Sequence, residues 1–237
     1  MKQDKDRQVR RKQIAACINE AVGSRFRKWK RSDPAAVELW GFYARETLHL
    51  GVRLSDEKMR YRGQEPPERR GALRPTVAAA LVYLADPADG ELIVDPMCGS
   101  GSILREGVAF NKHARYVGGD IAGDAAAESA VSLAGKGVDV REWDARDLPL
   151  EPATVDCFIC NLPFGRQYST PVANEALYPA LLSNWTEKLK QGGRMVLLTA
   201  DSAAVERALD TCGPAWRTEH KVKVLGTWAN IYTVQVA

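Results

Sequence analysis

From Pro75 onward the apolar residues follow two spacings in turn, one typical of helices and one typical of buried strands. Strands are expected at residues 92–95, 115–120, 138–144, 157–161, 195–199, 218–225 and 231–236. Helices are expected between them, at residues 75–84, 101–110, 124–133, 174–189 and 203–209. This alternation predicts an α/β, Rossmann-like fold with a mostly parallel seven-stranded sheet, in which ligands bind at the carboxyl ends of the strands.

The first 71 residues show a different pattern. Residues 8–22 carry apolar side chains at helical spacing, and residues 38–44 and 48–54 read as the two strands of a hairpin. Residues 60–71 are rich in Arg, Pro and Gly, which is typical of a linker or a surface loop. We therefore expect a small basic α+β appendage at residues 1–71 and a Rossmann-like domain at residues 72–237.

Charge is distributed unevenly between these two parts. Residues 1–75 hold 19 Lys and Arg against 10 Asp and Glu, whereas the remaining residues hold 14 against 20, although the net charge of the chain is only +3. A run of cations with interleaved aromatic rings follows the first helix, and it is either a solvated surface or a nucleic-acid contact. We take the second interpretation and predict that RNA contacts Arg25, Arg27, Lys28, Trp29, Lys30 and Arg31.

Composition limits the class of protein. With 45% hydrophobic and 27% charged residues, the chain is expected to bury a core rather than remain disordered. No apolar run approaches the ~18 residues that cross a bilayer, and Met1 is followed by charged residues rather than by a signal segment. The five cysteines are scattered and odd in number, so we expect a reducing cytoplasm.

A glycine-rich turn, Asp95-Pro96-Met97-Cys98-Gly99-Ser100-Gly101, lies between a predicted strand and a predicted helix. It lacks the Gly-Lys-Ser/Thr of a phosphate loop and the third glycine of the dinucleotide motif. The carboxylate of Asp95 would repel a pyrophosphate, but it suits a ligand that carries an amine. This combination predicts S-adenosylmethionine as the cofactor.

Two more acids end the next two predicted strands. Asp120 is placed where a carboxylate reaches ribose hydroxyls, and Asp144 could accept a hydrogen bond from an adenine amino group. Either acid alone could equally be a helix N-cap. Three acids at three successive strand ends favour a nucleoside site.

The segment Asn161-Leu162-Pro163-Phe164-Gly165 ends the fourth strand. An exocyclic amine is a weak nucleophile because its lone pair is delocalised into the ring. The amide oxygen of Asn161 and a backbone carbonyl beside it can hold such an amine without a charged base. Phe164 supplies a face on which a flipped base can stack.

Three motifs resemble those of the THUMP-associated tRNA guanosine N2-methyltransferases. They are Leu73-Arg74-Pro75-Thr76-Val77-Ala78-Ala79-Ala80-Leu81, the glycine-rich turn with Ser102, and Asn161–Gly165. The resemblance implies a class I methyltransferase with Asn161 and Leu162 at the target amine. It places Thr76 at the methionine carboxylate, Asp95 and Gly99 at its amine, Asp120 at the ribose and Asp144 at the adenine. The whole set expected to bind the cofactor is Thr76, Asp95, Pro96, Cys98, Gly99, Gly101, Asp120, Ile121, Asp144, Ala145 and Asn161.

The chain departs from related families at two points. Leu162 and Phe164 stand where adenine and glutamine amino-methyltransferases commonly have Pro and Tyr, which argues against those substrates. The first 75 residues are also too few for a THUMP domain together with the hairpin, so a partner protein could supply the missing RNA-binding module.

We therefore predict an enzyme that methylates the exocyclic N2 of guanosine in RNA, with tRNA as the expected substrate and no metal. The alternatives are an amino-methyltransferase for DNA adenine or protein glutamine, and a non-catalytic RNA-binding subunit that binds the cofactor. Cys157 and Cys160 are expected in an inert buried strand, and Trp216 and Trp228 in the core.

Overall fold

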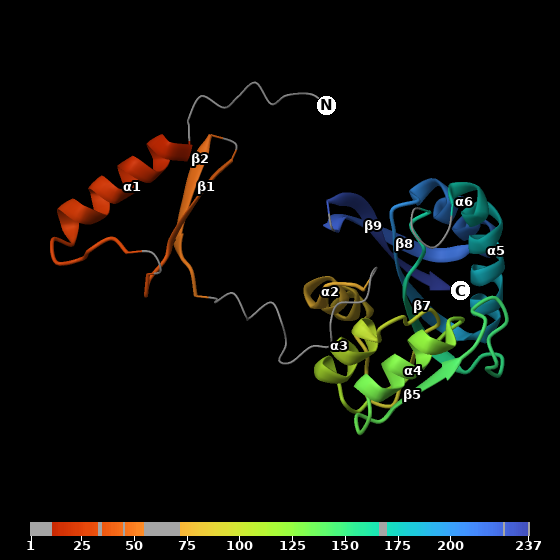
Figure 1. Cartoon of the computed structure of the whole chain (residues 1–237). Helices are drawn as coiled ribbons and strands as arrows, with labels where there is room; N and C mark the ends of the chain where they lie inside the picture. The colour runs from red at the N-terminus through yellow and green to blue at the C-terminus, as the bar shows by residue number, and fades with distance from the viewer. Residues whose placement is uncertain are drawn as a thin grey trace. The chain divides into compact units, whose positions relative to one another are not determined.

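The computed structural model describes residues 11–32, 35–44, 46–54, 72–165, 170–224 and 226–236. The chain divides into two compact units, Met1–Met59 and Arg60–Ala237 (Figure 1). The predicted domain boundary after residue 71 falls at the end of 55–71, outside the described residues.

The first unit consists of α1 (Arg11–Arg25) and a hairpin of β1 (Leu39–Ala44) and β2 (Thr47–Val52). The strands pair antiparallel, which confirms the predicted hairpin, and Phe42 lies opposite His49. A Cβ at Gly41 would lie 3.1 Å from the side chain of Ile18, so α1 packs closely on the hairpin. None of the described residues of this unit is buried, and its large exposed apolar side chains include Phe26, Trp29, Leu39, Trp40, Phe42, Tyr43, Leu48, Leu50 and Val52.

The second unit is built on one seven-stranded sheet with the order β5-β4-β3-β6-β7-β9-β8. Its strands are β3 (Leu92–Asp95), β4 (Arg115–Asp120), β5 (Val138–Glu142), β6 (Val155–Asn161), β7 (Leu189–Thr199), β8 (Pro214–Val224) and β9 (Thr227–Val236). The first five in sequence are parallel, and β9 is antiparallel to both of its neighbours. The predicted mostly parallel sheet is therefore confirmed.

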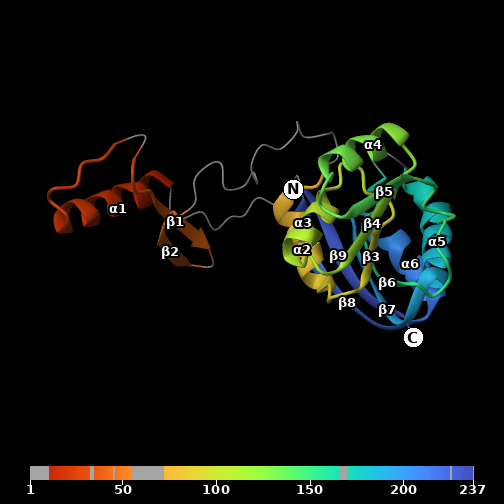
Figure 2. The same cartoon turned by 90° about the horizontal axis from the view of Figure 1, so that it is seen from below.

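Five helices cover the two faces of the sheet (Figures 1 and 2). They are α2 (Pro75–Ala85), α3 (Ser102–Phe110), α4 (Gly123–Ser132), α5 (Pro171–Lys188) and α6 (Ser202–Cys212). Helices α2 and α3 pack with one core, and α5 and α6 pack with the other. None of the helices in the described part of the chain has the length and apolar character needed to cross a membrane.

Strand β6 is buried on both faces, which explains its unbroken apolar run. Phe158 and Cys160 point into the core of α5 and α6, where Trp185 stacks on Phe158 at 5.4 Å between ring centroids. Cys157 points into the opposite core. The two cysteines are fully buried on opposite faces of the strand, as expected for inert residues and not for a pair of metal ligands.

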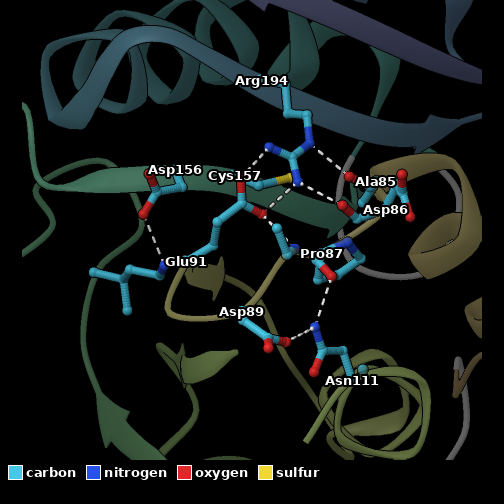
Figure 3. A network of polar contacts seen from close by, with 12 residues as sticks. Ala85, Asp86, Pro87, Asp89, Glu91, Asn111, Asp156, Cys157 and Arg194 are labelled. Atoms are coloured by element: carbon cyan, nitrogen blue, oxygen red, sulfur yellow. Dashed lines mark hydrogen bonds and ion pairs between the residues drawn. The ribbon is translucent and has the colours of Figure 1, made fainter. Parts of the chain in front are cut away.

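A polar network ties the amino ends of the central strands to the end of α2 (Figure 3). The guanidinium of Arg194 on β7 donates to both carboxylate oxygens of Glu91, at 2.8 and 2.7 Å, and to the carbonyls of Ala85 and Asp86. These contacts satisfy carbonyls that the helix end leaves open. The bonds from Arg194 hold the pKa of Glu91 below its usual range. The network lies at the amino ends of the strands, on the side of the sheet opposite their carboxyl ends. Its role is therefore structural.

Candidate active site

A cavity of about 640 Å³ opens at the carboxyl ends of the parallel strands. Its wall is formed by the segments that follow β3, β4, β5 and β6, together with the tip of the β8–β9 hairpin. Its lining residues from the predicted site are Asp95, Pro96, Cys98, Gly99, Asp120, Ile121, Asp144, Ala145, Asn161, Leu162, Pro163 and Phe164. The structure therefore brings together nearly all residues that were expected to bind the cofactor and the target base.

Gly101 shapes the glycine-rich turn without lining the cavity. Its φ of +72° lies in the left-handed region, and a Cβ there would collide with Ser129 and lie 2.9 Å from Leu133. The turn is closed by two backbone hydrogen bonds of 2.8 Å, from Gly101 N–H to the carbonyl of Cys98 and from Cys98 N–H to the carbonyl of Gly119. Glycine is thus required here so that α3 can begin close against α4.

Asp95 lies at the floor of the cavity with 1% of its surface exposed. Burial raises the pKa of this carboxyl to about 8, and the nearby charge of Asp120 acts in the same direction. The backbone N–H of Met97, at 3.3 Å, partly opposes the rise. A buried carboxyl in this condition favours a ligand that brings a positive charge.

Asp120 holds the glycine-rich turn against the end of β4. One carboxylate oxygen accepts a hydrogen bond from Gly99 N–H at 2.9 Å, and the other accepts one from Ala122 N–H at 3.0 Å. Because an ionised carboxylate offers about four acceptor positions, two remain for a ligand. Asp120 therefore has a structural role that the sequence did not reveal.

Trp143 is a further supporting residue that sequence reasoning missed. Its indole N–H donates to the carbonyl of Pro96 at 2.9 Å, and its ring occupies the space that a Cβ on Gly119 would need. This side chain, which directly follows β5, supports the turn through that hydrogen bond. In the sequence, only its position next to the predicted site residue Asp144 indicated that Trp143 could belong to the site.

Asp144 is already engaged by a neighbour. Both of its oxygens accept hydrogen bonds from the guanidinium of Arg146, and one also accepts the Arg146 backbone N–H at 2.9 Å. The bonds from Arg146 lower the pKa of Asp144. Since Arg146 also lines the cavity, an adenine amino group would share the carboxylate with this arginine.

Asn161 ends β6 with its side-chain oxygen buried at the cavity wall. This oxygen has no hydrogen-bond partner among the residues that the structure describes. Such an orphaned acceptor is costly unless a ligand satisfies it. Asn161 is therefore placed where its side-chain oxygen could accept a hydrogen bond from a ligand.

The turn after Asn161 is anchored from behind by two residues that the sequence analysis did not single out. The carbonyl of Pro163 accepts hydrogen bonds from the hydroxyl of Tyr178 and from the side-chain amide of Asn174, and both of these α5 side chains are fully buried. Leu162 N–H donates to the carbonyl of Leu198 at 2.9 Å. Phe164 is partly buried beside the cavity. The sequence predicts the helix that carries Tyr178, but only the fold shows its contact with the turn.

Two predicted placements need correction. Thr76 is exposed and does not line the cavity, because it lies with Ala80 and Tyr83 on the outer stripe of α2, while Ala72 and Leu73 line the cavity instead. Trp228 is 58% exposed, so its predicted burial is wrong. The side chain of Trp216 lies outside the described residues.

The predicted RNA-contacting cluster belongs to the first unit. Its five cations, Arg25, Arg27, Lys28, Lys30 and Arg31, are exposed and form no ion pair with any carboxylate that the structure describes. Trp29 stacks on Phe26 with 4.6 Å between ring centroids. Among the described residues, no group of three or more His, Cys, Asp or Glu could hold a metal ion.

Comparison with known proteins gives concordant results. The family model described as an RMKL-like methyltransferase domain matches residues 62–230. The chain is 35% identical over 175 residues to the mouse protein named tRNA (guanine(6)-N(2))-methyltransferase THUMP3, covering 67% of this chain and 34% of that protein. It is 29% identical over 137 residues to the Bos taurus U6 snRNA (guanine-N(2))-methyltransferase THUMPD2, covering 56% of this chain and 26% of that one.

The crystal structure of TrmN from Thermus thermophilus superimposes with a TM-score of 0.71 at 24% identity, covering 97% of this chain and 69% of that one. This likeness and the sheet order confirm the predicted Rossmann-like class I methyltransferase fold. The chain spans about a third of the length of the mouse relative, 34%. Because the family match covers most of the second unit, the chain belongs to the RMKL-like methyltransferase domain family.

Proposed function

We propose that this protein is an S-adenosylmethionine-dependent RNA methyltransferase that acts on the exocyclic N2 of guanosine. One observation carries the proposal: Asn161 lines the cavity together with Phe164 and the three acids, and its buried side-chain oxygen has no described hydrogen-bond partner. An amine donor and a stacked base would satisfy this arrangement. The names of the two relatives, both guanine-N2 methyltransferases, agree with it.

The residues around the cavity fit the cofactor. Asp95, buried and with its pKa raised to about 8, suits the positively charged amine of the methionine part. Asp120 keeps two acceptor positions for ribose hydroxyls, and Asp144 and Ala145, which line the cavity, would border the adenine. When bound, S-adenosylmethionine supplies a methyl group already activated on a sulfonium. Positioning is then the main task of the protein.

Asn161 would hold the target amine through one of its hydrogens. Its amide oxygen accepts that hydrogen, and the carbonyl of Leu162 takes the second, so that the nitrogen lone pair is directed toward the methyl group. The hydrogen bonds from Tyr178 and Asn174 to Pro163 keep this turn in place. Phe164 would stack on the base.

The substrate class within RNA follows from the relatives and from charge. The name of the mouse relative specifies guanine 6 of tRNA, and the name of the Bos taurus relative specifies a guanine of U6 snRNA. We propose tRNA as the substrate of this chain. The basic first unit would attract the RNA through the five cations of residues 25–31. We further propose that the exposed apolar residues of the hairpin contact a protein module that presents the RNA, since this unit buries no described side chain of its own.

The direct test is Asn161→Ala, assayed by single-turnover methylation of an unmodified tRNA transcript. Loss of an oriented acceptor should slow methylation about a hundredfold or more while cofactor affinity stays nearly unchanged in calorimetry. Asn161→Asp keeps an acceptor oxygen and should lose much less. If Asn161→Ala methylates at the wild-type rate, this role for Asn161 is wrong.

A further inference from the structure

The β8–β9 hairpin ends at the cavity and carries cations beside it. Val224 and Thr227, the last paired residues of the hairpin, both line the cavity. Lys223 is paired with Trp228 immediately next to them, and Lys221 lies two residues earlier on the same strand. The hairpin forms the β8 edge of the sheet (Figure 2).

Alternation along the strands separates two kinds of side chain. Val222, Val224 and Ala229 pack with the core of α2 and α3. Lys221, Lys223 and Trp228 therefore project from the opposite face, and all three are exposed. The apolar face fixes the hairpin in the protein, which leaves the basic face free to bind a ligand.

The two ammonium groups lie at the same indole ring. Lys221 Nζ is 5.5 Å and Lys223 Nζ 5.7 Å from the centroid of Trp228, and neither lysine forms an ion pair with a carboxylate in the described ranges. The indole nevertheless remains 58% exposed. Two like charges held at one exposed aromatic ring, neither of them in an ion pair with a described carboxylate, fit a polyanion that carries aromatic bases.

The register of the sheet places this group near the target position. Asn161 pairs with Leu198, Leu198 with Ile231, and Ile231 with His220. Three strand spacings thus separate Asn161 from β8, roughly 14 Å. Lys221 and Lys223 lie farther along β8 in the direction of the carboxyl edge. A nucleotide held at Asn161 would have its neighbours within reach of this hairpin.

We propose that Lys221, Lys223 and Trp228 form a binding subsite for the RNA strand that flanks the target guanosine. The two ammonium groups contact backbone phosphates, and the indole stacks on a flanking base. This inference rests on the proposed function and assigns part of the RNA-binding surface to the methyltransferase unit itself. The basic cluster of the first unit is then not the sole source of attraction.

The test uses the full chain and an unmodified tRNA transcript, with affinity measured across a range of salt concentrations. Lys221→Gln/Lys223→Gln should make the log–log salt dependence shallower by about 0.7–0.9 per lost phosphate contact. The matched control is Lys112→Gln/Lys136→Gln, which removes the same charge from exposed lysines at the amino ends of β4 and β5. The control should keep the wild-type slope, and both variants should bind S-adenosylmethionine normally.

Trp228 supplies a second readout, because stacking does not release counterions. Trp228→Ala should weaken tRNA binding about 5- to 150-fold without changing the salt slope, and Trp228→Phe should restore most of the affinity. The subsite is refuted if the two double-lysine variants share one slope, or if Trp228→Ala binds as tightly as the wild type. If the wild type methylates no RNA, the proposed function fails. If it methylates RNA but these variants match their controls, only the subsite fails.

Discussion

Replacement of Asp120 separates the structural and the ligand-binding roles of one carboxylate. In the protein without ligand, Asp120 accepts hydrogen bonds from Gly99 N–H at 2.9 Å and from Ala122 N–H at 3.0 Å. Asp120→Ala leaves both donors without this acceptor at a partly exposed position, which should lower the free energy of unfolding by about 1–3 kcal/mol. Thermal unfolding without ligand measures this part.

The ligand-binding part is additional. If the two remaining acceptor positions bind ribose hydroxyls, their loss should weaken S-adenosylmethionine binding by about 1.5–3 kcal/mol, or about 10- to 150-fold in Kd. Isothermal titration calorimetry at a temperature where the variant is folded measures it directly. Asp120→Asn retains one acceptor oxygen and should fall between the wild type and Asp120→Ala.

Asp210→Ala is the matched control, because it removes an exposed carboxylate on α6 that pairs with Arg217. It should change neither quantity appreciably. If Asp120→Ala unfolds more easily but binds S-adenosylmethionine with the wild-type Kd, Asp120 is only a support for the turn. An unchanged unfolding temperature would instead refute the role of its two backbone hydrogen bonds.

Three further predictions address stability, titration and charge. Arg194→Met should lower the free energy of unfolding in urea by about 2–3 kcal/mol, because Glu91 and two helix-end carbonyls lose their partner, whereas the exposed Arg217→Met should have almost no effect. The contribution of Asp95 to the free energy of unfolding should fall as pH rises from about 4 to about 8, because folded Asp95, with its pKa raised to about 8, keeps a proton that the unfolded chain releases. The stability of Asp95→Asn relative to the wild type should therefore rise over this range, and parallel urea profiles of the two proteins would contradict the prediction. Replacing all five cations of residues 25–31 by Gln should make the salt dependence of tRNA affinity shallower by up to about 0.7–0.9 per lost contact, whereas an unchanged slope would mark a merely solvated surface.

Much of the second unit could be predicted because its pattern is local. The strand at residues 115–120 matches β4, and the helix at residues 75–84 matches α2 to within one residue, since buried positions repeat at regular spacing. The start of β7 at Leu189 was missed, because Lys190 to Gly193 interrupts the apolar run. The extension of β7 is visible because Leu189 pairs with Val155, the first residue of β6. This pairing between two strands cannot be read from the sequence of β7 alone.

The parts of the site that escaped prediction depend on contacts between distant segments. Tyr178 and Pro163 are 15 residues apart, and their contact depends on how α5 packs on the sheet. Trp228 was expected in the core because tryptophan is large and apolar. It lies instead on the hairpin at the edge of the sheet, where its ring stays exposed beside two lysines. The motif residues came together because each lies at or just after the carboxyl end of a parallel strand, and those ends meet on one side of the sheet.

The most direct test of the central claim is the identity of the methylated nucleoside. The full chain is incubated with S-adenosylmethionine and an unmodified tRNA transcript, and the digested RNA is analysed by mass spectrometry, with Asn161→Ala in parallel. The account predicts N2-methylguanosine with the wild type and at least a hundredfold slower formation with Asn161→Ala. A methylated adenosine as the product, or no methylated nucleoside from protein that binds both S-adenosylmethionine and the transcript, would contradict it.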